Sequence, residues 1–165
     1  ANKRTDDDFL SFSLLSDMLG KGHSSYLYEN LVKEKGSFSS LSCYHNMSFD
    51  DGLFIISGTI EKSVSFINAE NLIIDCLSVF LDKTDNNHHL QKIKNQERTD
   101  HAIHTISLQE RVQNLAYASV LGDVEKVNTE SKEIENVSLE AIKDVFNTYL
   151  TTQNYRVLNY KSDQA

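Results

Sequence analysis

The sequence predicts an α+β domain in which helices pack on one face of a small antiparallel sheet. Helical stretches come first, two alternating runs follow around an Asp-Asp-Gly turn, and further helical stretches lead to a final strand-like run. Because strands and helices do not alternate strictly, this order does not fit a parallel doubly wound sheet. The length suits one domain. Since the chain opens on Ala-Asn-Lys-Arg, we expect residues 1–165 to be a single α+β domain excised from a longer protein.

The composition is that of an ordinary soluble globular protein, with 39% hydrophobic and 24% charged residues. The formal net charge of −8 argues against nucleic acid as a partner, because phosphate binding needs a clustered excess of Lys and Arg. No apolar run reaches the roughly 20 residues of a membrane span. We therefore expect a soluble protein of the cytoplasm or periplasm that binds neither nucleic acid nor membranes.

The corner between the first two predicted helices, residues 7–19 and 24–36, contains Gly20-Lys21-Gly22 and raises the question of a phosphate-binding loop. Such a loop follows a buried strand and places Ser or Thr directly after its lysine. Here a helix precedes the corner, and Gly22 follows Lys21. We therefore predict a helix–turn–helix corner in which the glycines supply the turn geometry.

After this corner, the sequence predicts a hairpin around Asp50-Asp51-Gly52, a helix over residues 65–81 and a polar loop over 84–89. A long helix over 90–121 follows, then a solvated linker around Glu133 and Glu135, a helix over 138–150 and a last strand over 154–160. Three strands make a small sheet, and an open sheet edge is a site for pairing with another strand. We expect a neighbouring strand from upstream of Ala1, or edge-to-edge self-association of two copies.

The two cysteines, Cys43 and Cys76, lie in apolar surroundings and are expected to be buried free thiols. His45 follows Cys43 by two residues, so their side chains share one face of a strand. A cysteine nucleophile needs a partnered base and a lowered thiol pKa. Because the surroundings of Cys43 indicate burial, we predict no catalytic residue.

A second candidate site is the pair His101 and His104, which lie three residues apart on a predicted helix whose start carries His88 and His89. This spacing allows two imidazoles to share a zinc ion. A zinc peptidase also needs a glutamate base beside its ligands, as in H-x-x-E-H, whereas Thr105 follows His104. We therefore predict a solvated helix face and no metal site.

Four stretches occur in a familiar order: Leu-Gly-Lys-Gly-His-Ser-Ser followed by Glu-Lys-Gly within 19–36, Asp-Asp-Gly-Leu-Phe at 50–54, a helical run ending in Leu-Gly-Asp at 111–123, and a closing helix and strand at 135–160. Together they resemble the C-terminal-type domain of the pitrilysin/insulinase zinc metallopeptidases, the inverzincins. The resemblance covers nearly the whole chain. Such enzymes are built from repeated α+β domains that close as a clamshell around a peptide.

The resemblance implies that zinc and the H-x-x-E-H helix belong to another domain of the parent protein, so this chain needs no cofactor. An Arg and a Tyr in the non-catalytic half of many family members contact substrate. The corresponding positions here are Val32 and Ser39, which cannot supply that pair. Val32 and Ser39 are therefore expected only to line the wall of the peptide chamber.

We accordingly expect a zinc-free structural and substrate-chamber domain of a zinc metalloendopeptidase that degrades peptides. It is not itself an enzyme, and its partners are a catalytic domain, in the same or a partner chain, and the peptide substrate. The alternative is an interaction domain of a non-proteolytic, peptidase-like assembly subunit. The presence of H-x-x-E-H in the parent sequence would distinguish the two.

Overall fold

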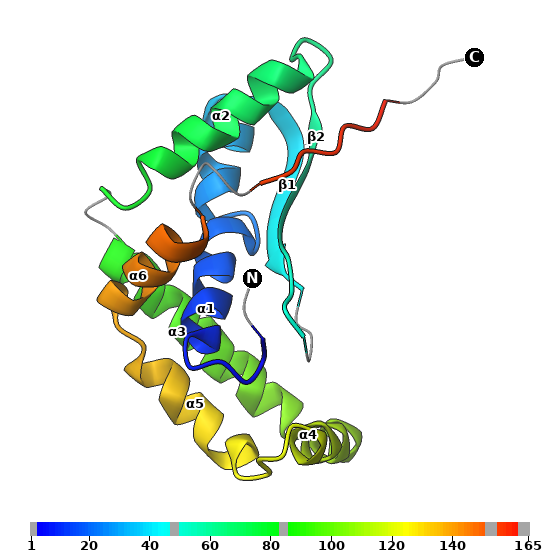
Figure 1. Cartoon of the computed structure of the whole chain (residues 1–165), viewed down its shortest axis with the longest axis vertical. Coiled ribbons are helices and arrows are strands. Elements are labelled where there is room, and N and C mark those ends of the chain that lie inside the picture. The colour runs from blue at the N-terminus through cyan, green and yellow to red at the C-terminus, as the bar shows by residue number, and fades with distance from the viewer. Residues whose placement is uncertain (1–2, 47–49, 83–85, 151–154, 162–165) are drawn as a thin grey trace.

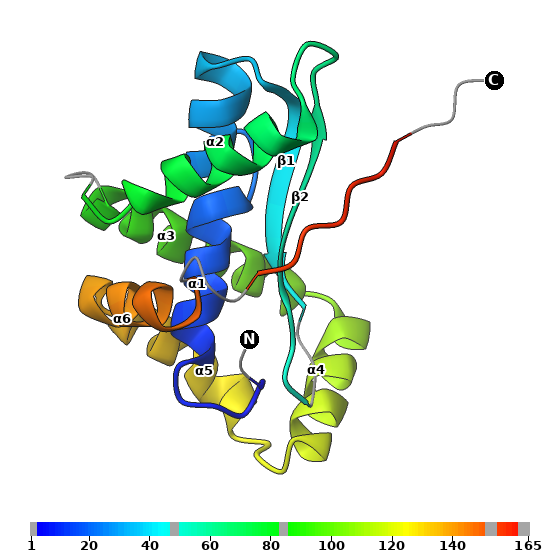
Figure 2. The ribbon, with the colours of Figure 1, turned by 45° about the horizontal axis from the view of Figure 1, so that its top comes forward.

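The computed structural model describes residues 3–46, 50–82, 86–150 and 155–161. In chain order its elements are α1 (Phe9–Gly20), η1 (Tyr28–Glu34), β1 (Phe38–His45), β2 (Phe54–Ile60), α2 (Phe66–Ser78), α3 (Asn86–His104), α4 (Leu108–Val120), α5 (Lys126–Asn136) and α6 (Leu139–Tyr149). Figures 1 and 2 show the β1–β2 hairpin along one side of the molecule, with α1, α3, α5 and α6 on the other and α4 near the lower end of the hairpin. The predicted class, an α+β fold with helices on one face of an antiparallel sheet, is confirmed.

Helix α1 is the central element, because it packs against β1 on one side and against α3 and α6 on the other. It ends at Gly20, where the helix passes so close to β1 that a Cβ atom on Gly20 would overlap Cys43. The chain then turns at Gly22, whose φ of +80° suits glycine. The segment that follows leads into η1, a single π-helical segment. The predicted helix–turn–helix corner is thus present.

The sheet has two strands in the described part of the chain, one fewer than predicted. β1 and β2 pair antiparallel, with Cys43 opposite Ile56 and an irregularity in register between Phe38 and Ser40. The last strand, predicted over residues 154–160, is wrong over residues 155–160, which are extended without strand pairing, and Asn154 lies outside the described residues. Strand-forming residues do not make a strand unless a neighbouring strand pairs with them.

The single helix predicted over residues 90–121 is two helices, α3 and α4. The side-chain oxygen of Ser107 accepts a hydrogen bond from the amide of Glu110 at 3.4 Å and starts α4 after a break. At the other end, α3 begins at Asn86, so residues 86–89 are helical and not part of a loop; residues 84–85 lie outside the described part. No described helix combines the length and the hydropathy of a membrane span.

The predicted linker around Glu133 and Glu135 is wrong, because both residues belong to helix α5. Lys94 of α3 holds this helix in place. Its ammonium donates to the carbonyl oxygens of Glu135 at 2.8 Å and of Val137 at 2.5 Å. Helix ends leave such carbonyls without intrahelical partners, and a lysine near them supplies the missing donors. Burial lowers the pKa of Lys94.

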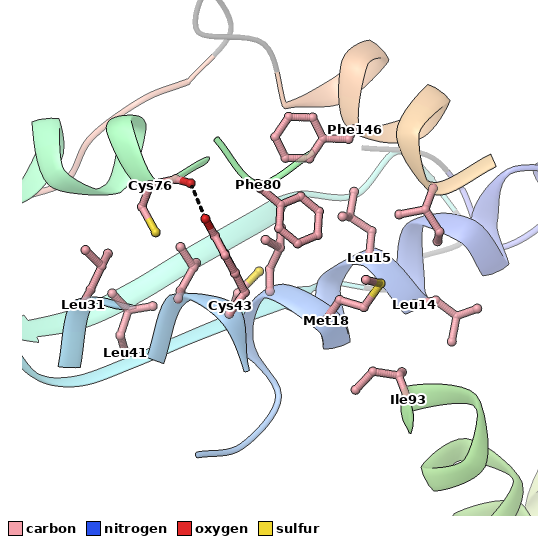
Figure 3. Close-up of a cluster of buried hydrophobic side chains, with 14 of the residues drawn as sticks. Leu14, Leu15, Met18, Leu31, Leu41, Cys43, Cys76, Phe80, Ile93 and Phe146 are labelled. Carbon is pink, nitrogen blue, oxygen red and sulfur yellow. Dashed lines mark hydrogen bonds between the residues drawn. The ribbon is translucent and has the colours of Figure 1, made fainter. Parts of the chain in front are cut away.

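The core lies between α1, β1, the end of α2 and α6 (Figure 3). Phe80 is fully buried there and packs its ring against Tyr26 and Phe146. The Tyr26 hydroxyl donates to the carbonyl oxygen of Cys76 at 3.1 Å, drawn as the dashed line in Figure 3. Cys43 and Cys76 are both buried, and neither is in a disulfide within the described residues, as predicted.

Candidate functional site

The outward face of the hairpin is a candidate binding surface, because helices cover only the other face. The register places Ser42 opposite Ser57 and Tyr44 opposite Ile55 on this side, with Ser40 opposite Thr59 at its end. The outward residues of β1 are exposed, whereas Phe38, Leu41, Cys43 and His45 point into the core. The result is an uncharged wall of small hydroxyl side chains, one tyrosine and the half-buried Ile55.

The structure places Val32 and Ser39, the two predicted chamber-wall residues, on different elements. Val32 is a half-buried residue of η1 that packs against the core. Ser39 is exposed at the irregular end of β1, and its hydroxyl donates to the carbonyl oxygen of Thr59 at 3.3 Å. Ser39 therefore borders the outward face of the hairpin, while Val32 contributes to packing behind it.

Cys43 and His45 share the inner face of β1, as their spacing predicts, but this face is the core. Burial raises the pKa of the Cys43 thiol far above its ordinary value, and a hydrogen bond with Ser16 offsets only part of this effect. His45 packs its ring against those of Phe9 and Phe12. A thiol with a raised pKa is not a nucleophile, so the arrangement is structural.

His101 and His104 lie near the end of α3 and are exposed. His104 Nδ1 lies 2.6 Å from Glu110 Oε2 of α4, a contact that bridges the break between the two helices. Within the described residues, no three His, Cys, Asp or Glu side chains are grouped closely enough to hold a metal ion. Zinc needs three or four such ligands, so the residues at this position do not fit a zinc site.

A groove of about 770 Å³ lies between α3, α4 and α5. The sequence did not predict this groove. It suggested one long helix in place of α3 and α4, and a linker in place of α5, so the three helices that form the groove were not recognised. Its lining mixes basic side chains such as Arg4 and Arg98 with acidic ones such as Glu97 and Glu130. Arg4 pairs with Glu130 at 2.5 Å. Because basic and acidic side chains pair across the groove, they hold the surrounding segments together. They do not indicate an ion-binding site.

At the end of this groove, Lys21 is surrounded by three carboxylates. Its Nζ lies 2.5 Å from Glu97, 3.3 Å from Asp17 and 3.5 Å from Asp100. The lysine of the apparent phosphate-loop motif therefore joins the Gly20 corner to α3. Burial raises the pKa of Asp17 to about 7, with the attraction of Lys21 opposing it and the hydrogen bond with Glu97 adding to it.

This raised pKa predicts a pH dependence of stability. Between about pH 4, the ordinary value for an aspartate, and pH 7, the folded chain keeps a proton on Asp17 that the unfolded chain releases. The free energy of unfolding therefore falls as pH rises through this window. Asp17→Asn should flatten the slope and make the chain more stable than wild type above pH 7.

Urea denaturation across this pH range measures the effect. Asp144→Asn, on the exposed side of α6, is the matched control and should leave the slope unchanged. If Asp17→Asn were instead less stable than wild type above pH 7, the ion pair with Lys21 would outweigh the cost of burying Asp17.

Comparison with known proteins places this geometry in a family. The family model described as the peptidase M16 inactive domain matches residues 1–97, which is more than half of the chain. A comparison with curated protein sequences finds no match.

Solved structures show the same fold at low sequence identity. The inactive peptidase domain of a candidate zinc protease from Bordetella parapertussis superposes with a TM-score of 0.84 at 17% identity, covering 100% of this chain and 89% of that one. A protease from Helicobacter pylori superposes with a TM-score of 0.84 at 19% identity, covering 92% of this chain and 37% of that one. This chain thus spans little more than a third of the Helicobacter protein.

A peptidase M16 inactive domain from Pseudomonas fluorescens is a third similar structure. Its TM-score is 0.78 at 17% identity, and the match covers 90% of this chain and 36% of that one. At these identities the likeness shows the fold.

Proposed function

Since this chain belongs to the family of M16 peptidase inactive domains, we propose that it is a zinc-free structural and substrate-chamber domain of a zinc metalloendopeptidase that degrades peptides. Its partners are the catalytic domain, which supplies zinc and the reacting groups, and the peptide substrate. The observation that carries the proposal is the family match, together with a sequence that contains no H-x-x-E-H stretch.

The outward face of the hairpin supports the role of a chamber wall. A surface that holds peptides of many sequences has to offer hydrogen-bonding groups without a fixed charge, because a fixed charge selects for one sign of substrate. Ser42, Ser57 and Thr59 provide such groups on this face, and Tyr44 adds an exposed ring. In this proposal Ser39 borders the wall, and Val32 holds η1 against the core behind it.

A charge placed on this wall tests the proposal in the parent peptidase. Ser42→Arg should raise the KM for basic peptides and lower it for acidic ones by about two- to fivefold, the size of one exposed charge pair. The value of kcat should stay the same, because the wall does not touch the reacting atoms.

Ser119→Arg, which adds the same charge to an exposed position of α4, is the matched control and should change neither constant. Equal effects of Ser42→Arg and Ser119→Arg would show that only the overall charge matters. The hairpin would then not face the substrate.

A second function is favoured by one observation, the outward side of α4. Leu108, Val112 and Leu115 repeat at helical spacing on this side and are 73%, 57% and 44% exposed. The side of α4 that faces the groove carries Gln113 and Asn114 instead. An exposed apolar stripe of this kind suits an interaction domain of a non-proteolytic assembly subunit. The parent sequence distinguishes the two functions, since only a peptidase carries H-x-x-E-H.

A further inference from the structure

The outward face of the hairpin changes in character along its length. The half away from the turn carries hydroxyl side chains, namely Ser40, Ser42, Ser57 and Thr59. The half beside the turn, at the lower end of the hairpin in Figures 1 and 2, carries Tyr44 and Ile55 directly opposite each other. The face therefore has a polar half and an apolar half.

Leu53 extends the apolar half by one residue. The amide of Asn46 donates to the carbonyl oxygen of Leu53 at 2.9 Å, so the pairing continues beyond the last pair of β1 and β2. Because side chains alternate along a strand, Leu53 lies on the same side as Ile55, and its 64% exposure agrees with this position. We call Tyr44, Leu53 and Ile55 the apolar end of the wall.

The three side chains of the apolar end are close enough to contact one side chain of a ligand. Opposed residues on one face have Cβ atoms about 5 Å apart, and neighbours on the same face of one strand are about 7 Å apart. Single exposed apolar side chains are ordinary on a protein surface, whereas contiguous ones are typical of a binding surface. A strand paired at the outer edge of β2 would lie in the plane of the sheet and would leave this face uncovered.

An apolar side chain is the ligand group that suits this end of the wall. Contact with the ring of Tyr44 and the aliphatic chains of Leu53 and Ile55 removes apolar surface from water on both sides, which is favourable. A charged side chain would lose part of its hydration without gaining a partner among these three residues. The acidic residues nearest in sequence, Asp50 and Asp51, belong to the turn, so a basic side chain is the competing ligand.

We propose that the apolar end of the wall is a specificity subsite that accepts a large apolar side chain of the peptide substrate. This inference rests on the proposed function, in which the hairpin faces the peptide, and it adds the class of substrate. The preferred peptides carry an aromatic or large aliphatic residue at the position that meets Tyr44. The hydroxyl side chains of the other half contact the neighbouring part of the peptide whatever its sequence, because they both donate and accept hydrogen bonds.

Peptides in which a single Phe replaces Ala at successive positions test this proposal in the parent peptidase. One position should show a lower KM with Phe than with Ala. Tyr44→Ser should reduce this preference about three- to tenfold, the effect of burying roughly 30–60 Å² less apolar surface. Tyr44→Phe should keep the preference, because it keeps the ring. The value of kcat should not change, since equal binding of substrate and transition state alters KM alone.

Leu53→Ser and Ile106→Ser are the matched pair, because each removes an exposed aliphatic side chain of the same size and Ile106 lies outside the hairpin, between α3 and α4. Leu53→Ser should weaken the preference for Phe, and Ile106→Ser should leave it unchanged. Equal effects of the two variants would overturn the proposal. A stronger preference for Lys than for Phe, at the position that Tyr44→Ser affects, would also overturn it and assign the contact to the acidic turn.

Ser42→Arg separates failure of this subsite from failure of the proposed function. If Ser42→Arg shifts the KM for charged peptides while Tyr44→Ser leaves the preference for Phe unchanged, the hairpin faces the substrate and the subsite is wrong. If neither variant changes any KM, the hairpin does not face the substrate, and both proposals are wrong. Since Tyr44 is 48% exposed, Tyr44→Ser should fold normally, and an unchanged urea midpoint checks this.

Discussion

Phe80→Ala should destabilise the chain by about 3–5 kcal/mol, the usual range for removing a buried phenylalanine. Phe80 has no solvent exposure, and its ring lies 4.9 Å from that of Tyr26 and 5.5 Å from that of Phe146, measured between centroids. It therefore joins the turn after α2 to the segment before η1 and to α6 (Figure 3). These neighbours come from three parts of the chain, so they cannot easily close over the cavity.

The neighbouring position supplies the control. Val79 is 50% exposed, and Val79→Ala should change the free energy of unfolding by no more than about 0.5 kcal/mol. Urea denaturation of the two variants measures the difference. Similar midpoints for both would mean that the ring of Phe80 does not support the core as its contacts indicate.

Gly20→Ala should destabilise the chain by about 2–3 kcal/mol, even though alanine is the better helix former. Propensity alone predicts a gain of up to about 1 kcal/mol for this change within a helix. The added methyl group would, however, overlap the backbone nitrogen and the Cβ of Cys43 on β1. Neither atom belongs to a flexible side-chain end, so α1 and β1 would have to separate. The expected loss is therefore opposite in sign to the propensity effect.

Gly22→Ala separates this packing effect from backbone strain. Gly22 has a φ of +80°, and no atom lies within 4 Å of the place a Cβ would take. The variant should lose about 1–2 kcal/mol through its left-handed backbone alone, and the structure of the α1–β1 contact should not change. A gain in stability from Gly20→Ala would contradict the close approach of α1 to β1.

Elements with local signals were predicted from the sequence. The acidic turn before Gly52 marks the hairpin, and Ser138 starts α6 by accepting a hydrogen bond from the amide of Ala141 at 3.1 Å. The break before α4 also has a local signal, since Ser107 and Glu110 have the spacing of a capping box. This break was nevertheless not predicted. No Gly or Pro interrupts the sequence there, and the helical periodicity on both sides suggests one helix.

The parts that were predicted wrongly depend on contacts between distant residues. Helix α5 has no fully buried residue and is held by Arg4 and by Lys94, neither of which is near it in sequence. The groove depends on α5 and was therefore missed as well. Ile67 of α2 is 72% exposed despite its apolar side chain. No local pattern contains this information.

The zinc content of the purified chain tests the central claim most directly. After dialysis against buffer containing zinc and then against metal-free buffer, elemental analysis should find far less than one zinc per chain, and a quenched peptide should remain uncleaved. Addition of zinc should not change the melting temperature, since a ligand bound only by the folded state would raise it. One tightly held zinc per chain, with peptide cleavage that a chelator abolishes, would contradict the assignment of this chain as a zinc-free domain.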